Sequence, residues 1–226
     1  MKNILLKTLY PILTNQGPFA DHVGKHSWDL YAEMQDISVR SHQLYLQGDW
    51  ELIDLRKPAQ QTLTAAFQHT ARVTEQIYRD HRGDCRILYT DPDTVMHRPL
   101  RIFGEYREFR LFDDKQLTGP QTEDYYSCCV RYFPEGLSHR FWRHMHRHLE
   151  QLWRYDVYAY EMEMYRQLMW LQKIDLHKPQ HHIWAERSVY THSLVDWDRI
   201  PQSIVHLGCS ANLETALDIM RKKIQP

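Results

Sequence analysis

The chain has 226 residues, of which 42% are hydrophobic and 25% are charged, and its formal net charge is −1. This is the composition of an ordinary globular protein, and the small net charge excludes a uniformly basic nucleic-acid-binding protein, so that any such binding must be local. Because no long Gly/Ser-rich or Pro-rich linker interrupts the sequence, we expect one domain over 1–226, with a mainly helical part at 1–82 and a mixed part at 84–226.

The first third of the chain is predicted to be helical. Residues 3–14 have the pattern of a short helix that bends at Pro11. Apolar residues then recur at helical spacing over 19–46 and again over 58–81, where a proline suits the first turn and Gly83 follows the end. These segments predict an N-terminal helical layer.

The rest of the chain alternates between strand and helix patterns. Branched and aromatic runs predict strands at 86–90, 101–112, 125–133, 156–165, 183–190 and 204–207. A final helix is expected from Ser210 to Lys223. The strand at 125–133, the helix after it and the strand at 156–165 would form a βαβ unit with parallel strands. The predicted class is therefore α+β, with the helical layer packed on a small mixed sheet that contains one βαβ unit.

The segment 137–154 has the clearest period in the sequence. At about 100° per residue its large apolar side chains fall on one broad side, as in an amphipathic helix that packs on a core. The opposite side carries four arginines: Arg140, Arg143, Arg147 and Arg154. Two interpretations stay open, a solvated polar face or a site for an anion, because guanidinium groups match phosphate and carboxylate oxygens.

The function expected from this pattern is a non-catalytic binding or assembly protein. In this hypothesis the four arginines contact an acidic partner, either a protein surface or a nucleic-acid backbone. Trp142 and Trp153 are expected to pack beneath the helix rather than to stack on bases. The alternative is a nuclease, for which the chain offers two different sets of residues.

The first set is Arg143 with His148, which resembles the Arg-x4-His pattern of helical ribonucleases of the HEPN class. The resemblance implies that this pair polarises the phosphate and activates the ribose hydroxyl without a metal. The second set is Asp93 with Glu105, which is similar to the PD…ExK arrangement of restriction-type nucleases. This resemblance implies Mg²⁺ held by the two carboxylates, although Arg107 replaces the usual lysine.

Metal and cofactor signals elsewhere are weak. His22, His26 and Asp29 have helical spacing that would place three ligands on one face, but solvated side chains explain them equally well. No glycine-rich nucleotide motif is present, so neither a cofactor nor a resident metal is expected. The N-terminal apolar run is too short to cross a membrane, and the chain is expected to be cytoplasmic, with no membrane partner.

Overall fold

The computed structural model describes residues 1–13, 27–107, 109–113, 115–116, 126–151, 182–184, 197–199, 203–207 and 213–224. The strands in these residues are β1 (Lys2–Thr8), β2 (Glu51–Leu55), β3 (Cys85–Thr90), β4 (Thr94–Met96), β5 (Arg110–Asp113), β6 (Lys115–Gln116), β7 (Tyr126–Phe133), β8 (His182–Trp184) and β9 (Ile204–His206). The helices are α1 (Ser27–Tyr45), α2 (Leu63–Asp80), α3 (His139–Gln151), the 3-10 turn η2 (Trp197–Arg199) and α6 (Leu213–Ile224).

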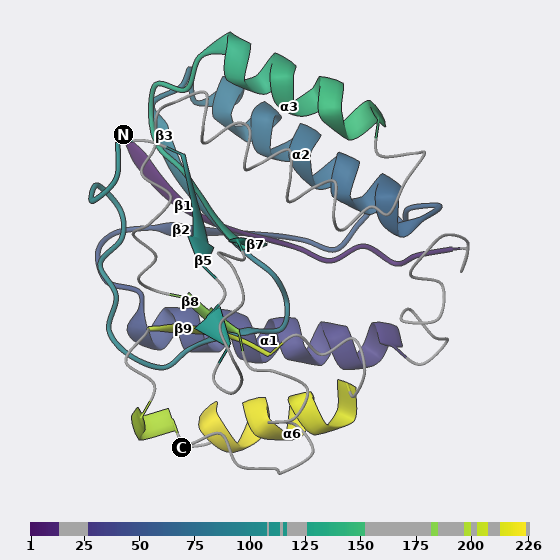
Figure 1. The fold of residues 1–226 in the computed structure, drawn as a ribbon, viewed down its shortest axis with the longest axis vertical. Coiled ribbons are helices and arrows are strands. Elements are labelled where there is room, and N and C mark those ends of the chain that lie inside the picture. The colour runs from purple at the N-terminus through teal and green to yellow at the C-terminus, as the bar shows by residue number, and fades with distance from the viewer. Residues whose placement is uncertain are drawn as a thin grey trace.

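The main sheet has five strands in the order β2-β1-β3-β7-β5. β1 is parallel to both of its neighbours, whereas β7 is antiparallel to β3 and β5. The connection from β1 to β2 contains α1, and the connection from β2 to β3 contains α2, on the opposite face of the sheet (Figure 1). β2 and β3 lie on opposite sides of β1, so the topological switch point of the sheet is between β1 and β3. Open α/β sheets bind their ligands at such a point, beyond the carboxyl ends of the strands.

Side chains along the central strands alternate between two buried faces. In β1, Ile4 and Leu6 face the aromatic cluster under α2 and α3, while Leu5 faces a second cluster on the other side. β3 repeats this alternation with Ile87 and Leu88. A strand that is buried on both faces reads as a continuous apolar run, and this is what Ile4-Leu5-Leu6 is.

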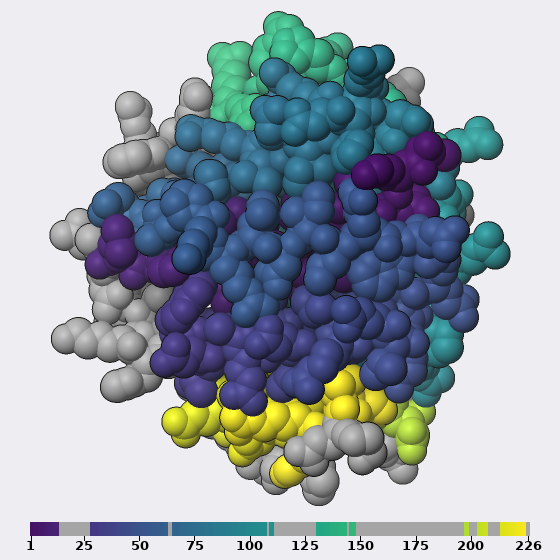
Figure 2. Space-filling model, turned by 180° about the vertical axis from the view of Figure 1, so that it is seen from behind, coloured from purple at the N-terminus to yellow at the C-terminus, as the bar shows by residue number. Residues whose placement is uncertain are grey.

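A second, smaller sheet lies on the α1 side, with the strand order β4-β9-β8-β6. β9 pairs antiparallel with β4, and its Val205 packs with Met34 of α1 and Met220 of α6. α1 and α6 lie side by side along one face of the molecule (Figures 1 and 2). At their contact, Arg221 donates to both carboxylate oxygens of Glu33.

These elements confirm a mixed α/β class but not the predicted N-terminal layer. Residues 2–8 form the central strand β1, so the predicted helix over 3–14 is wrong. A short apolar run between two lysines fits either a helix or a buried strand, and burial on both faces decides for the strand. The helix expected over 19–46 is present as α1 in the part that the structure describes, from Ser27. The helix expected over 58–81 is present as α2, but it begins at Leu63 after the N-cap Thr62 rather than at Pro58.

Two further predictions need correction or lie outside the described residues. The strand expected over 101–112 is present only at its end, as β5, because the chain turns at Gly104, where φ is +92°. The strand expected at 156–165 lies outside the described residues. The parallel βαβ units that the structure does describe are β1-α1-β2 and β2-α2-β3, in the part that was expected to be helical.

Helix α3 has the predicted amphipathic character. The Ser138 hydroxyl accepts a hydrogen bond from the Phe141 backbone N–H at 3.3 Å, which helps to cap its first turn. Phe141, Trp142 and Met145 are buried in the aromatic cluster, whereas three arginines are exposed: Arg140, Arg143 and Arg147. Among the described helices, none is long and apolar enough to cross a membrane.

Candidate metal centre

A tight turn at the carboxyl end of β3 carries two aspartates. Asp91 directly follows the last residue of β3, and its carbonyl accepts hydrogen bonds from the Thr94 hydroxyl at 2.7 Å and the Thr94 N–H at 3.3 Å. The second bond closes a β-turn, for which Pro92 supplies the preset φ at the second position. The turn thus places Asp91 and Asp93 next to each other at the switch point.

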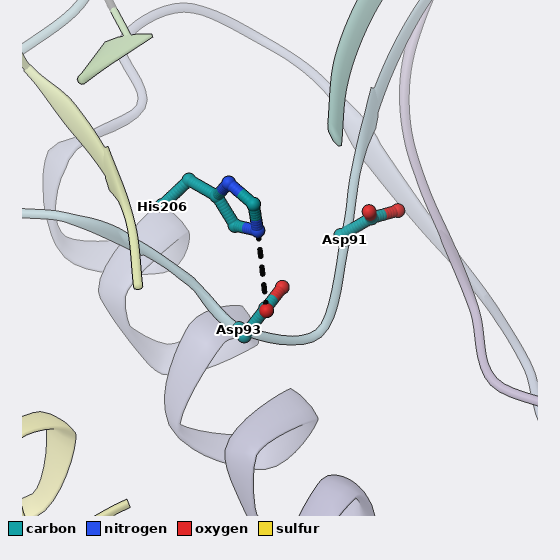
Figure 3. A group of neighbouring side chains, drawn as sticks. All are labelled: Asp91, Asp93 and His206. Atoms are coloured by element: carbon teal, nitrogen blue, oxygen red, sulfur yellow. Dashed lines mark hydrogen bonds and ion pairs between the residues drawn. The ribbon is translucent and has the colours of Figure 1, made fainter. Parts of the chain in front are cut away.

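Strand β9 brings a histidine to this turn from the far end of the sequence. His206 is opposite Thr94 in the antiparallel β4–β9 pair, and the Leu207 N–H donates to the Asp93 carbonyl at 3.0 Å. The Nε2–H of His206 donates to Asp93 Oδ2 at 3.2 Å, with Asp91 beside them (Figure 3). Backbone pairing therefore fixes where the imidazole lies.

The three side chains form a candidate set of metal ligands, called the metal-ligand group below. One ligand atom from each of Asp91, Asp93 and His206 lies within 4.8 Å of the other two, and Asp93 and His206 are buried. Two carboxylates and one imidazole fit a first-row divalent cation such as Mn²⁺ better than Ca²⁺, which takes oxygen ligands. A cation held there would replace the proton that Nε2 shares with Asp93.

Charges around the turn support binding of a cation. Burial raises the pKa of Asp91, and the neighbouring Asp93 carboxylate raises it further, whereas the charge of Arg131 lowers it. Arg131 is itself buried in β7, with its guanidinium 4.4 Å from the centre of the Tyr89 ring. Two carboxylates with oxygens within 4.8 Å of each other repel, and a bound cation relieves that repulsion.

Beneath the turn lies a network of buried polar groups from β1, α1 and β3. The Lys7 ammonium donates to the hydroxyls of Ser38 and Thr90, each at 2.6 Å. His42 donates from Nδ1–H to the Ser38 carbonyl at 2.7 Å, and its Nε2 lies 3.4 Å from the Thr90 hydroxyl. Because the Ser38 carbonyl can only accept, the His42 ring carries its hydrogen on Nδ1.

Burial shifts the pKa values of the basic groups in this network in the direction opposite to that at Asp91, because in each case it favours the neutral form. It lowers the pKa of Lys7 to about 7, and the carboxylates of Asp91, Asp93 and Asp54 counteract this. It also lowers the pKa of His42 to about 3, with a further contribution from the charge of Lys7. His42 is therefore neutral at physiological pH.

The structure describes part of the two predicted nuclease sites. Asp93 belongs to the metal-ligand group, but Glu105 lies in a turn after Ile102 and is not part of that group. Arg143 is exposed on α3, and the side chain of His148 lies outside the described residues. The pairing of Arg143 with His148 therefore stays a prediction.

Most of the remaining predicted site residues are not described. His22, His26 and Arg154 lie outside the described residues, and Asp29 is exposed in the first turn of α1. Sequence reasoning missed Asp91 and His206 as candidate ligands. The available signal was the Asp-Pro-Asp sequence directly after the predicted strand at 86–90, of which only Asp93 was considered as a ligand.

Comparisons with known proteins bear on the fold. No protein-family model matches the chain, and no curated protein matches its sequence. Among solved structures, the chain is similar to a glycosyltransferase involved in the glycosylation of the major capsid of PBCV-1, with a TM-score of 0.60 and 9% identity over 98% of this chain and 100% of that one. A galactosyltransferase, LgtC in complex with donor and acceptor sugar analogs, matches with a TM-score of 0.37 and 10% identity over 97% of this chain and 95% of that one.

The first similarity corrects the functional expectation. A fold shared over nearly the whole chain with a glycosyltransferase contradicts both a non-catalytic binding or assembly protein and a nuclease. It equally contradicts an acidic protein surface or a nucleic acid as the partner of the arginines on α3. The prediction failed because it was built on the most periodic segment, and periodicity reports packing rather than chemistry.

Proposed function

We propose that this protein is a glycosyltransferase that binds the phosphate leaving group of its sugar donor through a divalent cation at Asp91, Asp93 and His206. One observation carries the proposal. The metal-ligand group lies at the carboxyl ends of the parallel strands, at the switch point of a fold that the chain shares with a glycosyltransferase. Ligand sites in open α/β sheets are expected at this position.

The reaction needs charge neutralisation at the leaving group. In transfer, the bond between the anomeric carbon of the sugar and the phosphate oxygen breaks, and an acceptor oxygen bonds to that carbon and loses its proton. A divalent cation, when bound, supplies positive charge to the departing phosphate. The donor class that fits such a site is a sugar on a nucleoside diphosphate. Small divalent cations such as Mg²⁺ are commonly bound by one or two carboxylates together with substrate phosphates.

The protein's own residues hold this site in place. The Asp91–Thr94 turn fixes the two carboxylates side by side, and the β4–β9 pairing fixes the imidazole against Asp93. The charge of Arg131 favours the ionised form of Asp91, which is the form that binds a cation. A site that is held by backbone pairing in this way is organised before the donor arrives.

The test begins with the leaving group, so that it does not require the acceptor. UDP and GDP are titrated into the protein with Mn²⁺ and with EDTA, and donor hydrolysis is followed with the corresponding nucleotide sugars. We expect Mn²⁺-dependent binding of a nucleoside diphosphate that Asp91→Asn and Asp93→Asn remove, and that the matched surface control Asp29→Asn retains. Binding that is unaffected by EDTA, or by both Asp91→Asn and Asp93→Asn, would contradict the proposal.

A further inference from the structure

Lys7 is a fully buried cation at the carboxyl end of β1. Strand alternation puts its side chain on the same face as Leu5, towards α1, where its exposed fraction is 0%. Its ammonium has three N–H donors, and five oxygens lie within hydrogen-bond distance of it: Ser38 Oγ (2.6 Å), Thr90 Oγ1 (2.6 Å), Asp91 O (2.8 Å), Thr90 O (3.1 Å) and Thr94 Oγ1 (3.4 Å). Within the described residues, none of these acceptors is a carboxylate.

Fold stability alone gives a poor account of this lysine. Burying an ammonium group without a direct ion pair costs free energy, which hydrogen bonds to neutral oxygens only partly return. An apolar residue at position 7 would simply continue the buried run of Ile4, Leu5 and Leu6. The cost points to a role beyond packing.

A contact with Asp91 links Lys7 to the metal-ligand turn. The Asp91 carbonyl accepts from the Lys7 ammonium at 2.8 Å and also from both the hydroxyl and the N–H of Thr94. The same ammonium is bound to Ser38 of α1 and to Thr90 at the end of β3. A single group therefore ties the metal-ligand turn to β1, α1 and β3.

We propose that Lys7 is a positioning residue that holds the Asp91–Thr94 turn in the geometry that binds the cation. This inference rests on the proposed metal site, but it concerns a residue that is not a ligand. Lys7 acts through the Asp91 backbone rather than on the donor.

The sign of the effect separates this role from the alternatives. A positive charge near the site repels a cation, so an effect through charge alone would make Mn²⁺ bind more tightly when the lysine is removed. A role in global stability alone would lower the unfolding temperature and leave the Mn²⁺ affinity of the folded protein unchanged. Loss of positioning would weaken Mn²⁺ binding instead.

The experiment is a calorimetric titration of Mn²⁺ into the wild type, Lys7→Met and Lys2→Met, at one fixed pH. Lys2→Met is the matched control, because it removes an exposed lysine charge from the other end of β1. We expect Lys7→Met to bind Mn²⁺ at least about 10-fold more weakly, in the range seen for residues that orient metal ligands, and Lys2→Met to match the wild type. Unchanged or tighter binding by folded Lys7→Met would overturn the proposal.

A second variant keeps the test decisive if Lys7→Met does not fold. Ser38→Ala keeps the lysine but removes its anchor on α1 and a contact to Thr94 at 3.3 Å. We expect a smaller loss of Mn²⁺ affinity in the same direction, and wild-type affinity in this variant would count against positioning. A wild type that binds no Mn²⁺ would overturn the proposed function itself, together with this inference.

Discussion

Two regions of this molecule are built on the same strands with different chemistry. At the carboxyl ends of β1 and β3, polar side chains are buried: Lys7, Thr90 and Asp93, with His42 of α1 beside them. Under α3 the buried groups are mainly aromatic, with Phe133 stacked on Trp142 at a ring separation of 5.7 Å, and the buried Glu75 of α2 pairs there with His146. The charges of α3 are on its exposed side. A protein keeps polar groups buried, at a cost in free energy, where function needs them, so the comparison assigns function to the first region and stability to the second.

The largest expected effect is at the first region. Asp93→Asn replaces a charged ligand with a neutral amide of the same shape, and it also weakens the contact with His206. We expect Mn²⁺ affinity to fall by more than about 100-fold, beyond the range for residues that only orient ligands, while the protein stays folded. Calorimetric titration measures the affinity. Wild-type affinity in Asp93→Asn would contradict the assignment of cation binding to this region.

The aromatic region should show the opposite pattern. Trp142→Ala leaves a cavity among Phe133, Phe141 and Tyr78, and we expect the free energy of unfolding to fall by about 3–5 kcal/mol. The Mn²⁺ affinity of the folded variant should remain that of the wild type. Denaturant unfolding and Mn²⁺ titration on the same sample measure the two quantities. A variant that loses affinity but not stability would contradict the assignment of α3 to packing.

The buried His42 should make the stability of the protein depend on pH. Its pKa is about 3 in the folded protein, chiefly because of burial, whereas an unfolded histidine titrates near 6.5. Between these values the unfolded state binds the extra proton, so stability is fully present above the unfolded pKa and falls as the pH falls towards 3. We expect His42→Asn to reduce this slope by up to about 1.4 kcal/mol per pH unit.

Urea unfolding of the wild type and His42→Asn at pH 6, 5 and 4 measures that difference. His81 is half-buried on the surface after α2, and His81→Asn is the matched control. Parallel stability curves for the wild type and His42→Asn would show that His42 is not held neutral by its surroundings.

The smallest effect is expected on the exposed face of α3. The triple change of Arg140, Arg143 and Arg147 to Gln alters surface side chains, and we expect the free energy of unfolding to change by no more than about 0.5 kcal/mol for each. Binding of Mn²⁺ and of nucleoside diphosphates should match the wild type. A large loss of nucleotide binding in the triple variant would show that the functional region extends to this helix.

The sequence predicted packing better than chemistry. The stripe of α3, the helices α1 and α2 and the strands β3 and β7 follow from local periodicity, because each buries one face or both faces in a regular way. β1 was misread because three apolar residues between lysines do not distinguish a strand from a helix. One of those lysines, Lys7, is fully buried, although lysine side chains in proteins are mostly exposed.

The site itself depends on contacts between distant parts of the chain. Asp93 was recognised as a carboxylate at a turn, but it was paired with Glu105, which is close in sequence. Its partner His206 reaches the turn only through the β4–β9 pairing, which no local pattern encodes. The local sequence Asp-Pro-Asp after a strand thus contains two of the three candidate ligands, and the fold brings the third, His206, to them.

The central claim is that Asp91, Asp93 and His206 bind one divalent cation, and crystallography with Mn²⁺ and a nucleoside diphosphate tests it most directly. We expect an anomalous scattering peak for Mn²⁺ about 2.0–2.3 Å from a ligand atom of each of the three residues, with the diphosphate oxygens completing the coordination of the ion. Nucleotide bound elsewhere, or bound at this turn with no metal peak between the three side chains, would contradict it.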